Sequence, residues 1–131
     1  MTIPLRLAVA TALVMAFAQT ASAEGDPEKG EKVFKKCKIC HAVGEGAKKK
    51  VGPILNDIIG ATAGAQEGYR YSKAMKKAGE EGLTWTDENL HKYLLKPKDL
   101  VKGTKMVFPG LKKEADRANV IAYLRKYSKS E

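Results

Sequence analysis

The residues most able to do chemistry in this chain lie in one short stretch, CKICH, which runs from Cys37 to His41. The sequence has 131 residues but contains only two cysteines and two histidines. Both cysteines, Cys37 and Cys40, and one of the two histidines fall within these five positions. Residues three and four positions apart share a face of a helix, so we expect the two thiols and the imidazole to project together.

Two thiols one turn apart, beside an imidazole, fit a flat macrocycle that is held at its edge. The thiols would form thioether bonds and His41 would reach a central iron, and Cys-x-x-Cys-His is the attachment pattern of c-type haem. A structural zinc site is a weaker alternative, because it needs four ligands in a tetrahedron and only His91 could complete the set. A thioredoxin-like redox pair belongs in a βαβ context that this sequence lacks. A disulfide across so short a loop would stabilise little.

An iron with six ligands needs a second axial residue, and three residues outside the motif have suitable side chains. His91 lies beside the apolar stripe of an expected helix, and Met75 lies between lysines on a short one. Met106 lies in a turn-rich connector, GTKMVFPG, which could present a thioether across a flat cofactor. Spacing alone does not choose among the three.

The first 23 residues have the pattern of a secretory signal peptide. Arg6 precedes an apolar run over residues 7–18, and small residues at 21–23 form a cleavage pattern. The run is shorter than the roughly 20 apolar residues that span a bilayer, so a retained anchor is the weaker alternative. We therefore expect residues 24–131 to form one soluble domain in the periplasm.

The chain is strongly basic, with a net charge of +9. Such a charge favours acidic proteins, anionic lipid or nucleic acid as partners. Export argues against nucleic acid, and so does the lack of aromatic residues interleaved with the basic ones, which single-strand binding faces have. Acidic proteins and anionic lipid therefore remain the candidate partners.

Helical periodicity and caps predict an all-α domain with a large share of ordered loop. The segments predicted as helical are 27–37, 71–79, 86–96 and 112–127, with a short helical turn over 54–60. Asp26 and Thr86 are suitable N-caps, Gly79 should end the second helix, and Pro97 should end the third. A small domain with so much loop has a thin core, which itself indicates a bulky bound group.

Several motifs occur in an order that resembles class I cytochromes c, most closely the mitochondrial-like carriers of the bacterial periplasm. They are CKICH, VGP, YRYS, GLTW, KYLLKPK, GTKMVFPGLKK and VIAYLRKY. The resemblance implies a single cytochrome c domain, in which crossing N- and C-terminal helices and ordered loops wrap one covalent haem c. It implies thioethers at Cys37 and Cys40, axial ligation by His41 and Met106, and a His41 ring fixed by the Pro53 carbonyl.

The resemblance also assigns residues around the haem. Tyr93 and Thr104 match family positions near the methionine ligand, and Tyr71 and Trp85 match positions near the propionates. Three more residues match the crossing of the first and last helices: Gly30, Phe34 and Tyr123.

Two positions depart from the family pattern. Ala61 follows Gly60 where many members have an arginine that pairs with a propionate, and Arg70 is the candidate to replace it. Met75 occupies a place where asparagine is common. The stretch KKAGEEGLTW is a few residues longer than in the mitochondrial type, as it is in the bacterial carriers.

One-electron transfer is the function that this resemblance implies. With His41 and Met106 both bound the iron has no open position, so the chain is not expected to be an enzyme. The alternative is a small haem enzyme or gas sensor with a labile methionine. A monomeric carrier would take electrons from a quinol-oxidising cytochrome complex to a photosynthetic reaction centre or a terminal oxidase or reductase. Acidic sites on these membrane complexes would meet the family's ring of lysines: Lys36, Lys48, Lys49, Lys50, Lys98, Lys105, Lys112 and Lys113.

Overall fold

The computed structural model describes residues 25–129, and the expected signal peptide, residues 1–23, lies outside the described residues. Five α-helices occur in the described part: α1 (Pro27–Phe34), α2 (Lys73–Glu80), α3 (Asp87–Leu95), α4 (Pro97–Leu100) and α5 (Glu114–Arg125). The only β-type pairing between residues 25 and 129 is an isolated bridge that joins Thr62 to Thr84. The prediction of an all-α fold is confirmed.

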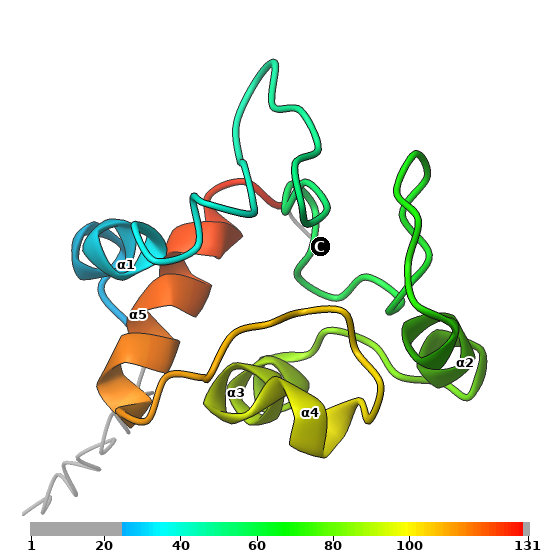
Figure 1. The fold of residues 1–131 in the computed structure, drawn as a ribbon. Coiled ribbons are helices and arrows are strands. Elements are labelled where there is room, and N and C mark those ends of the chain that lie inside the picture. The colour runs from blue at the N-terminus through cyan, green and yellow to red at the C-terminus, as the bar shows by residue number, and fades with distance from the viewer. Residues whose placement is uncertain (1–24, 130–131) are drawn as a thin grey trace, which may run out of the picture.

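Figure 1 shows how the helices are arranged. α1 crosses α5, α3 and α4 lie next to this pair, and α2 lies at the opposite side of the molecule. Long irregular segments connect α1 to α2 and α4 to α5. Over residues 25–129, no helix has both the length and the apolar character needed to cross a membrane.

α1 begins where it was predicted to begin but ends earlier. Asp26 accepts hydrogen bonds from two amides of the first turn, and Pro27 occupies the first helical position. The helix was predicted to reach Cys37, yet it ends at Phe34. The Phe34 carbonyl accepts hydrogen bonds from the amides of both Cys37 and Lys38, at 2.7 and 3.1 Å, which tightens the chain into a turn. The CKICH segment therefore forms a turn of its own beyond α1.

α1 and α5 cross at a close approach that requires glycine. A Cβ atom on Gly30 would lie 1.9 Å from the carbonyl oxygen of Asn119 in α5. The neighbouring rings of Phe34 and Tyr123 pack with their centroids 5.2 Å apart. Just before α1, the amide of Asp26 donates to the Asn119 side chain at 2.8 Å. These contacts join the two ends of the domain.

α3 has the predicted cap and buried face, and a further short helix follows it. The Thr86 hydroxyl accepts a hydrogen bond from the first turn, and Leu90, Tyr93 and Leu94 are buried. After one extended residue, Pro97 starts α4, where its missing amide proton would have had no helical partner. Pro97 thus ends α3 as predicted, but the helix that it begins was not predicted.

Gly79 lies inside α2 and does not end it. The helix continues to Glu80, and a Cβ atom on Gly79 would lie 1.8 Å from the Ala63 carbonyl oxygen. Close approach, and not helix termination, therefore explains this glycine. The short helical turn predicted over residues 54–60 does not form: the segment makes irregular turns, and Asp57 has a φ of 58°.

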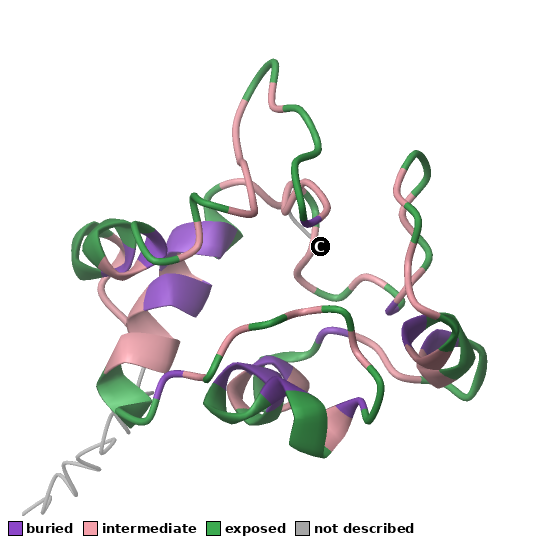
Figure 2. Ribbon diagram, viewed as in Figure 1, coloured by how far each residue is buried: buried purple, intermediate pink, exposed green. Residues whose placement is uncertain are grey.

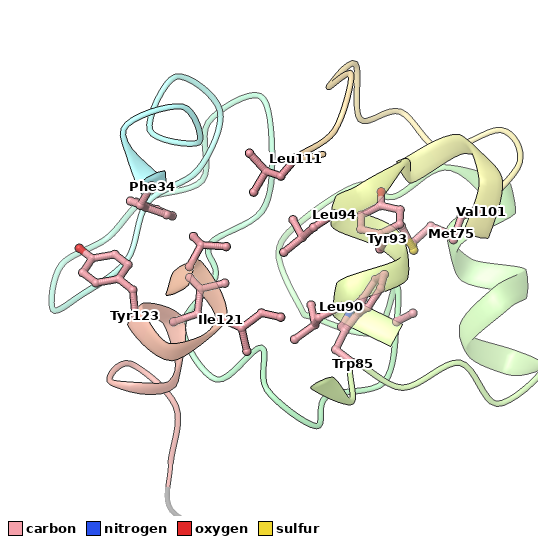
Figure 3. Close-up of a cluster of buried hydrophobic side chains, with 13 residues drawn as sticks. Phe34, Met75, Trp85, Leu90, Tyr93, Leu94, Val101, Leu111, Ile121 and Tyr123 are labelled. Atoms are coloured by element: carbon pink, nitrogen blue, oxygen red, sulfur yellow. The ribbon is translucent and has the colours of Figure 1, made fainter. Parts of the chain in front are cut away.

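The buried core is small and follows the helices. Figure 3 shows Phe34, Tyr123 and Ile121 at the α1–α5 crossing, and Tyr93 and Trp85 around α3. In Figure 2 the buried residues lie mainly on the inner sides of the helices, whereas most of the connecting segments are half-buried or exposed. Much apolar loop surface is therefore only partly covered by protein.

Candidate haem site

The CKICH segment forms a single closed turn that holds its three reactive residues within one turn of the backbone. The His41 amide donates to the Cys37 carbonyl at 2.8 Å, and the Cys40 amide donates to the same oxygen at 3.1 Å. Both cysteines are free thiols and are half-buried. The spacing that was expected from a helix is thus provided by one turn of helix-like hydrogen bonding.

The imidazole of His41 is held by the loop that follows. Its Nδ1 atom lies 2.7 Å from the carbonyl oxygen of Pro53. A carbonyl can only accept a hydrogen bond, so Nδ1 carries the proton and Nε2 keeps a free lone pair. Gly52 brings the loop this close: its amide donates to the Cys40 carbonyl at 2.8 Å, and a Cβ atom there would lie 2.5 Å from Cε1 of His41.

Burial favours the neutral form of both kinds of group in the motif. It lowers the pKa of His41 below its usual value, although the hydrogen bond to Pro53 opposes this effect. Burial also raises the pKa of Cys37 to about 11. The neighbouring Cys40 adds to this rise, and Lys36 opposes it. A neutral imidazole can bind a metal through Nε2, whereas the Cys37 thiol, which keeps its proton, is a poor redox nucleophile. This disfavours Cys37 as the attacking thiol of a dithiol-redox pair.

Met106 lies on a connector, residues 101–113, that is held firmly near the methionine. The Tyr93 hydroxyl and the Thr104 hydroxyl are 2.6 Å apart, and the Met106 amide donates to Thr104 Oγ1 at 3.3 Å. Burial raises the pKa of Tyr93, although its contact with Thr104 opposes this, so its hydroxyl keeps a proton at neutral pH. The Met106 side chain itself is half-buried against the core.

The other two candidate ligands have structural partners elsewhere. Met75 is 7% exposed within α2 and belongs to the hydrophobic core. His91 accepts a hydrogen bond at its Nδ1 atom from Arg117 of α5, over 3.4 Å. Of the three candidates, Met106 is thus the one on a connector, with a side chain that is neither in the core nor hydrogen-bonded.

The predicted aromatic residues lie in two pairs. Trp85, which is buried, packs against Tyr93 with ring centroids 4.8 Å apart. Tyr71 is half-buried and packs edge-on against Tyr69 at 4.8 Å. Burial raises the pKa of Tyr71, and Tyr69 adds to the effect while a backbone hydrogen bond opposes it.

Tyr69 was missed by the sequence analysis, although it joins three loops. Its hydroxyl donates to the Val51 carbonyl at 2.7 Å, and the Lys105 ammonium lies 5.9 Å from its ring centroid. Its edge meets Tyr71. The two tyrosines of YRYS flank the exposed Arg70, but this pattern does not indicate the contacts that Tyr69 makes with distant residues.

The donor set and the apolar surroundings fit a covalently bound macrocycle. Two free thiols and an oriented imidazole provide the attachment chemistry, and several apolar side chains remain only half-buried although they pack on the core. These side chains are Leu55, Ile58, Tyr71, Leu100, Met106 and Phe108. Over residues 25–129, no group of three or more histidine, cysteine or acidic side chains is placed to hold a metal ion. The tetrahedral zinc alternative therefore lacks its ligands.

The position that departs from the family pattern contributes through its backbone. The Ala61 carbonyl accepts the Trp85 amide at 2.8 Å, and the Trp85 carbonyl accepts the Gly60 amide at 2.8 Å. Arg70, the candidate replacement for the missing arginine, is exposed, and its carbonyl accepts a hydrogen bond from Lys105. The Arg70 guanidinium itself forms no hydrogen bond with the residues that the structure describes.

All eight lysines that were predicted to dock a partner are exposed, and none pairs with an acid among the described residues. Three of them are nevertheless tethered to backbone carbonyls. Lys49 donates to Gly68 at 2.8 Å, Lys50 donates to Lys38 at 2.9 Å, and Lys105 donates to Arg70 at 2.6 Å. These hydrogen bonds keep the charges at the surface while they restrict the side chains.

The sequence matches the cytochrome c family over residues 27–128. It is 55% identical to cytochrome c2 of Rhodomicrobium vannielii over 116 residues. The aligned region covers 88% of this chain and 89% of that protein. It is 50% identical to cytochrome c-554 of Methylosinus trichosporium, with 86% of both chains covered. The structure of cytochrome c2 from Rhodospirillum centenum superposes with a TM-score of 0.77 at 44% identity, and covers 80% of this chain and all of that one. This chain belongs to the cytochrome c family, and its cofactor is a covalently attached haem c.

Proposed function

We propose that this protein is a one-electron carrier whose haem c is attached at Cys37 and Cys40 and ligated by His41 and Met106. The observation that supports this best is the 2.7 Å contact that fixes the His41 ring on Pro53 and leaves Nε2 free. When bound, haem c supplies an iron that gains or loses one electron without making or breaking bonds. Membership of the family and relatives named cytochrome c2 support the carrier function.

The chain would hold both proposed iron ligands through contacts of its own. Pro53 and Gly52 hold the imidazole in one orientation, so His41 would need no rearrangement between oxidation states. Tyr93 and Thr104 fix the start of the Met106 connector. A methionine ligand and apolar surroundings both favour ferrous iron, and so raise the reduction potential.

A carrier is favoured over the alternative, a small haem enzyme or gas sensor with a labile methionine. Two protein ligands would leave no coordination position for a substrate or gas. An absorption spectrum of the reduced holoprotein under carbon monoxide at neutral pH tests this. The carrier should bind little carbon monoxide and show a far-red methionine–iron band when oxidised. Ready binding of carbon monoxide to the unaltered protein would favour the sensor or enzyme.

The signal pattern of residues 1–23 supports export, and we infer that the mature protein works as a monomer in the periplasm. Its partners are then acidic docking sites on membrane redox complexes, a quinol-oxidising cytochrome complex on one side and an oxidase or reaction centre on the other. The exposed lysines support this because they would steer fast, weak association.

Charge reversal of Lys98 or Lys36 should slow electron transfer to an acidic partner at low salt. A single reversal should lower the bimolecular rate by about threefold to tenfold, and the effect should fade as salt screens the charge. Stopped-flow kinetics at several ionic strengths measure this, and the reduction potential should stay nearly unchanged.

Lys129→Glu is the matched control for these two reversals. It changes the net charge equally, and only the backbone amide of Lys129 is used internally, in a hydrogen bond to Asp57 at 2.9 Å. An equal slowing in this variant would mean that net charge matters and the proposed ring does not.

The ferric protein should exchange Met106 for a lysine at high pH. A thioether binds ferric iron weakly, and an ordinary lysine becomes a competing nitrogen donor as it loses its proton, near pH 10.4. Lys98 and Lys105 are the candidate donors, and we expect Lys98 to be favoured, because the Lys105 ammonium is bound to the Arg70 carbonyl at 2.6 Å and lies over Tyr69. Lys98→Ala should therefore raise the transition pH more than Lys105→Ala, as measured by loss of the far-red band.

The combined variant, Lys98→Ala with Lys105→Ala, separates a lysine ligand from other donors. We expect the transition to move to higher pH or to yield a different spectrum of the alkaline form. If the double variant keeps the original midpoint and spectrum, Lys102 or hydroxide is the incoming ligand and the assignment is wrong.

A further inference from the structure

The connector that carries Met106 ends at a joint between three elements. The Leu111 amide donates to the Leu94 carbonyl of α3 at 2.7 Å. From α5, Nη1 of Arg117 donates to the carbonyls of Leu111 and Lys112, at 2.7 and 3.0 Å. Leu111 is also buried, at 3% exposure. One guanidinium thus holds the end of the connector against α3 and α5.

His91 of α3 completes this joint. Nε of Arg117 donates to Nδ1 of His91 over 3.4 Å, and both side chains are half-buried. A guanidinium has donors only and stays charged, so Nδ1 must act as an acceptor. That requires a neutral imidazole with its proton on Nε2. A protonated imidazole has a donor at both nitrogens and cannot make this contact.

We propose that His91 is a positioning residue for electron transfer: its neutral ring holds Arg117 on the end of the Met106 connector, and its protonation releases that hold. The inference rests on the proposed role of Met106 as an axial ligand. Histidine is the side chain that ordinarily changes charge between about pH 5 and 8. The joint therefore loosens when His91 is protonated, and Met106 would detach from ferric iron more often.

Charged groups of both signs lie on the elements around His91. Arg117 faces it from α5, and Lys112 and Lys113 lie on the connector segment that Arg117 binds and at the N-cap of α5. Glu114 and Asp116 lie in the first turn of α5. On α3 itself, Asp87 and Glu88 lie one turn earlier, and each is already paired, Asp87 with Arg125 at 2.6 Å and Glu88 with Lys92 at 2.8 Å. Protonated His91 would nevertheless repel Arg117, because the two groups in direct contact would both be positive and neither could accept a hydrogen bond from the other.

The other end of the connector does not share this sensitivity. There, Tyr93 and Thr104 are joined at 2.6 Å through hydroxyl groups, and burial keeps the Tyr93 hydroxyl protonated well above neutral pH. Acid thus affects one attachment of the connector and leaves the other in place. The expected outcome is a partial opening near Leu111 and not general unfolding.

Azide binding to the ferric holoprotein measures this opening, because azide reaches the iron only when Met106 has left. Azide affinity should be about three- to tenfold higher near pH 5.5 than near pH 8, the range expected for the loss of one ordinary hydrogen bond. His91→Asn keeps an acceptor at the Nδ1 position and should bind azide weakly at both pH values. His91→Leu has no acceptor and should bind azide tightly at both.

A second measurement, amide hydrogen exchange at Leu111, follows the joint without using the iron. Exchange should be faster near pH 5.5 than the intrinsic pH effect predicts in the unaltered protein, and this excess should vanish in His91→Asn. The inference is overturned if His91→Asn keeps the pH dependence of the unaltered protein, or if His91→Leu binds azide as weakly as that protein at pH 8.

The far-red band of the unaltered ferric protein at pH 8 separates failure of this inference from failure of the proposed ligation. If the band is present and azide affinity does not depend on pH, the role of His91 is wrong while the Met106 assignment stands. If the band is absent, both the Met106 assignment and this inference fall.

Discussion

Met106→Ala should keep its covalent haem but lose the far-red methionine–iron band and bind carbon monoxide when reduced. Alanine has no ligand atom, so the sixth position opens. The thioether favours ferrous iron, so the reduction potential should fall on the order of 100 mV, nearly two powers of ten in the one-electron equilibrium. Redox titration followed at the visible absorption bands measures the fall.

Met75→Leu is the matched control, because it replaces the other candidate thioether by a side chain of similar volume. Met75 lies on α2 and is buried in the hydrophobic core. The far-red band and the reduction potential of this variant should therefore remain close to those of the unaltered protein. The assignment fails if Met106→Ala keeps the band, and Met75 and His91 then become the ligands to test.

Gly30→Ala should destabilise the protein, although helix propensity alone predicts the opposite. An alanine in the middle of a helix is ordinarily more favourable than glycine by about 0.5–1 kcal/mol. Here the added Cβ would lie 1.9 Å from the Asn119 carbonyl oxygen and 2.8 Å from Cβ of Tyr123, so α1 and α5 must move apart. We expect a net loss of about 1–3 kcal/mol, as for other overpacked sites.

Denaturant unfolding of the holoprotein measures this loss, and Lys32→Ala is the control. Lys32 lies two residues further along the same helix and is exposed, so its replacement changes helix propensity away from the crossing. A stability gain in Gly30→Ala would mean that the helices approach less closely than the structure has them.

The parts of the fold that could be predicted from sequence are those with a local cause. Two helix starts could be predicted in this way. Asp26 and Thr86 accept hydrogen bonds from amides of the following turn, and the ring of Pro27 suits the first helical position. The Cys37–His41 motif predicts haem attachment because all of its reactive residues lie within five positions. Spacing alone did not distinguish Met106 from Met75 and His91 as the second iron ligand, and the family resemblance led to the prediction of Met106.

Two of the features that were missed depend on distant contacts. Gly79 looks like a helix end in sequence, yet a Cβ atom there would lie 1.8 Å from the Ala63 carbonyl oxygen, 16 residues earlier in the chain. Tyr69 is important only because Val51 and Lys105, far away in sequence, meet it in space. No local pattern contains this information.

The contact that fixes the Met106 connector closes a short loop of chain, whereas the contacts between the terminal helices close a long one. Tyr93 and Thr104 are 11 residues apart, whereas Asp26 and Asn119 are 93 apart. By the logarithmic dependence of loop entropy on length, closing the longer loop costs about 2 kcal/mol more. The contact between α3 and the connector therefore re-forms at a smaller cost in chain entropy than the crossing of α1 and α5. We expect ligand exchange at Met106 and global unfolding to be separate events, with separate free energies.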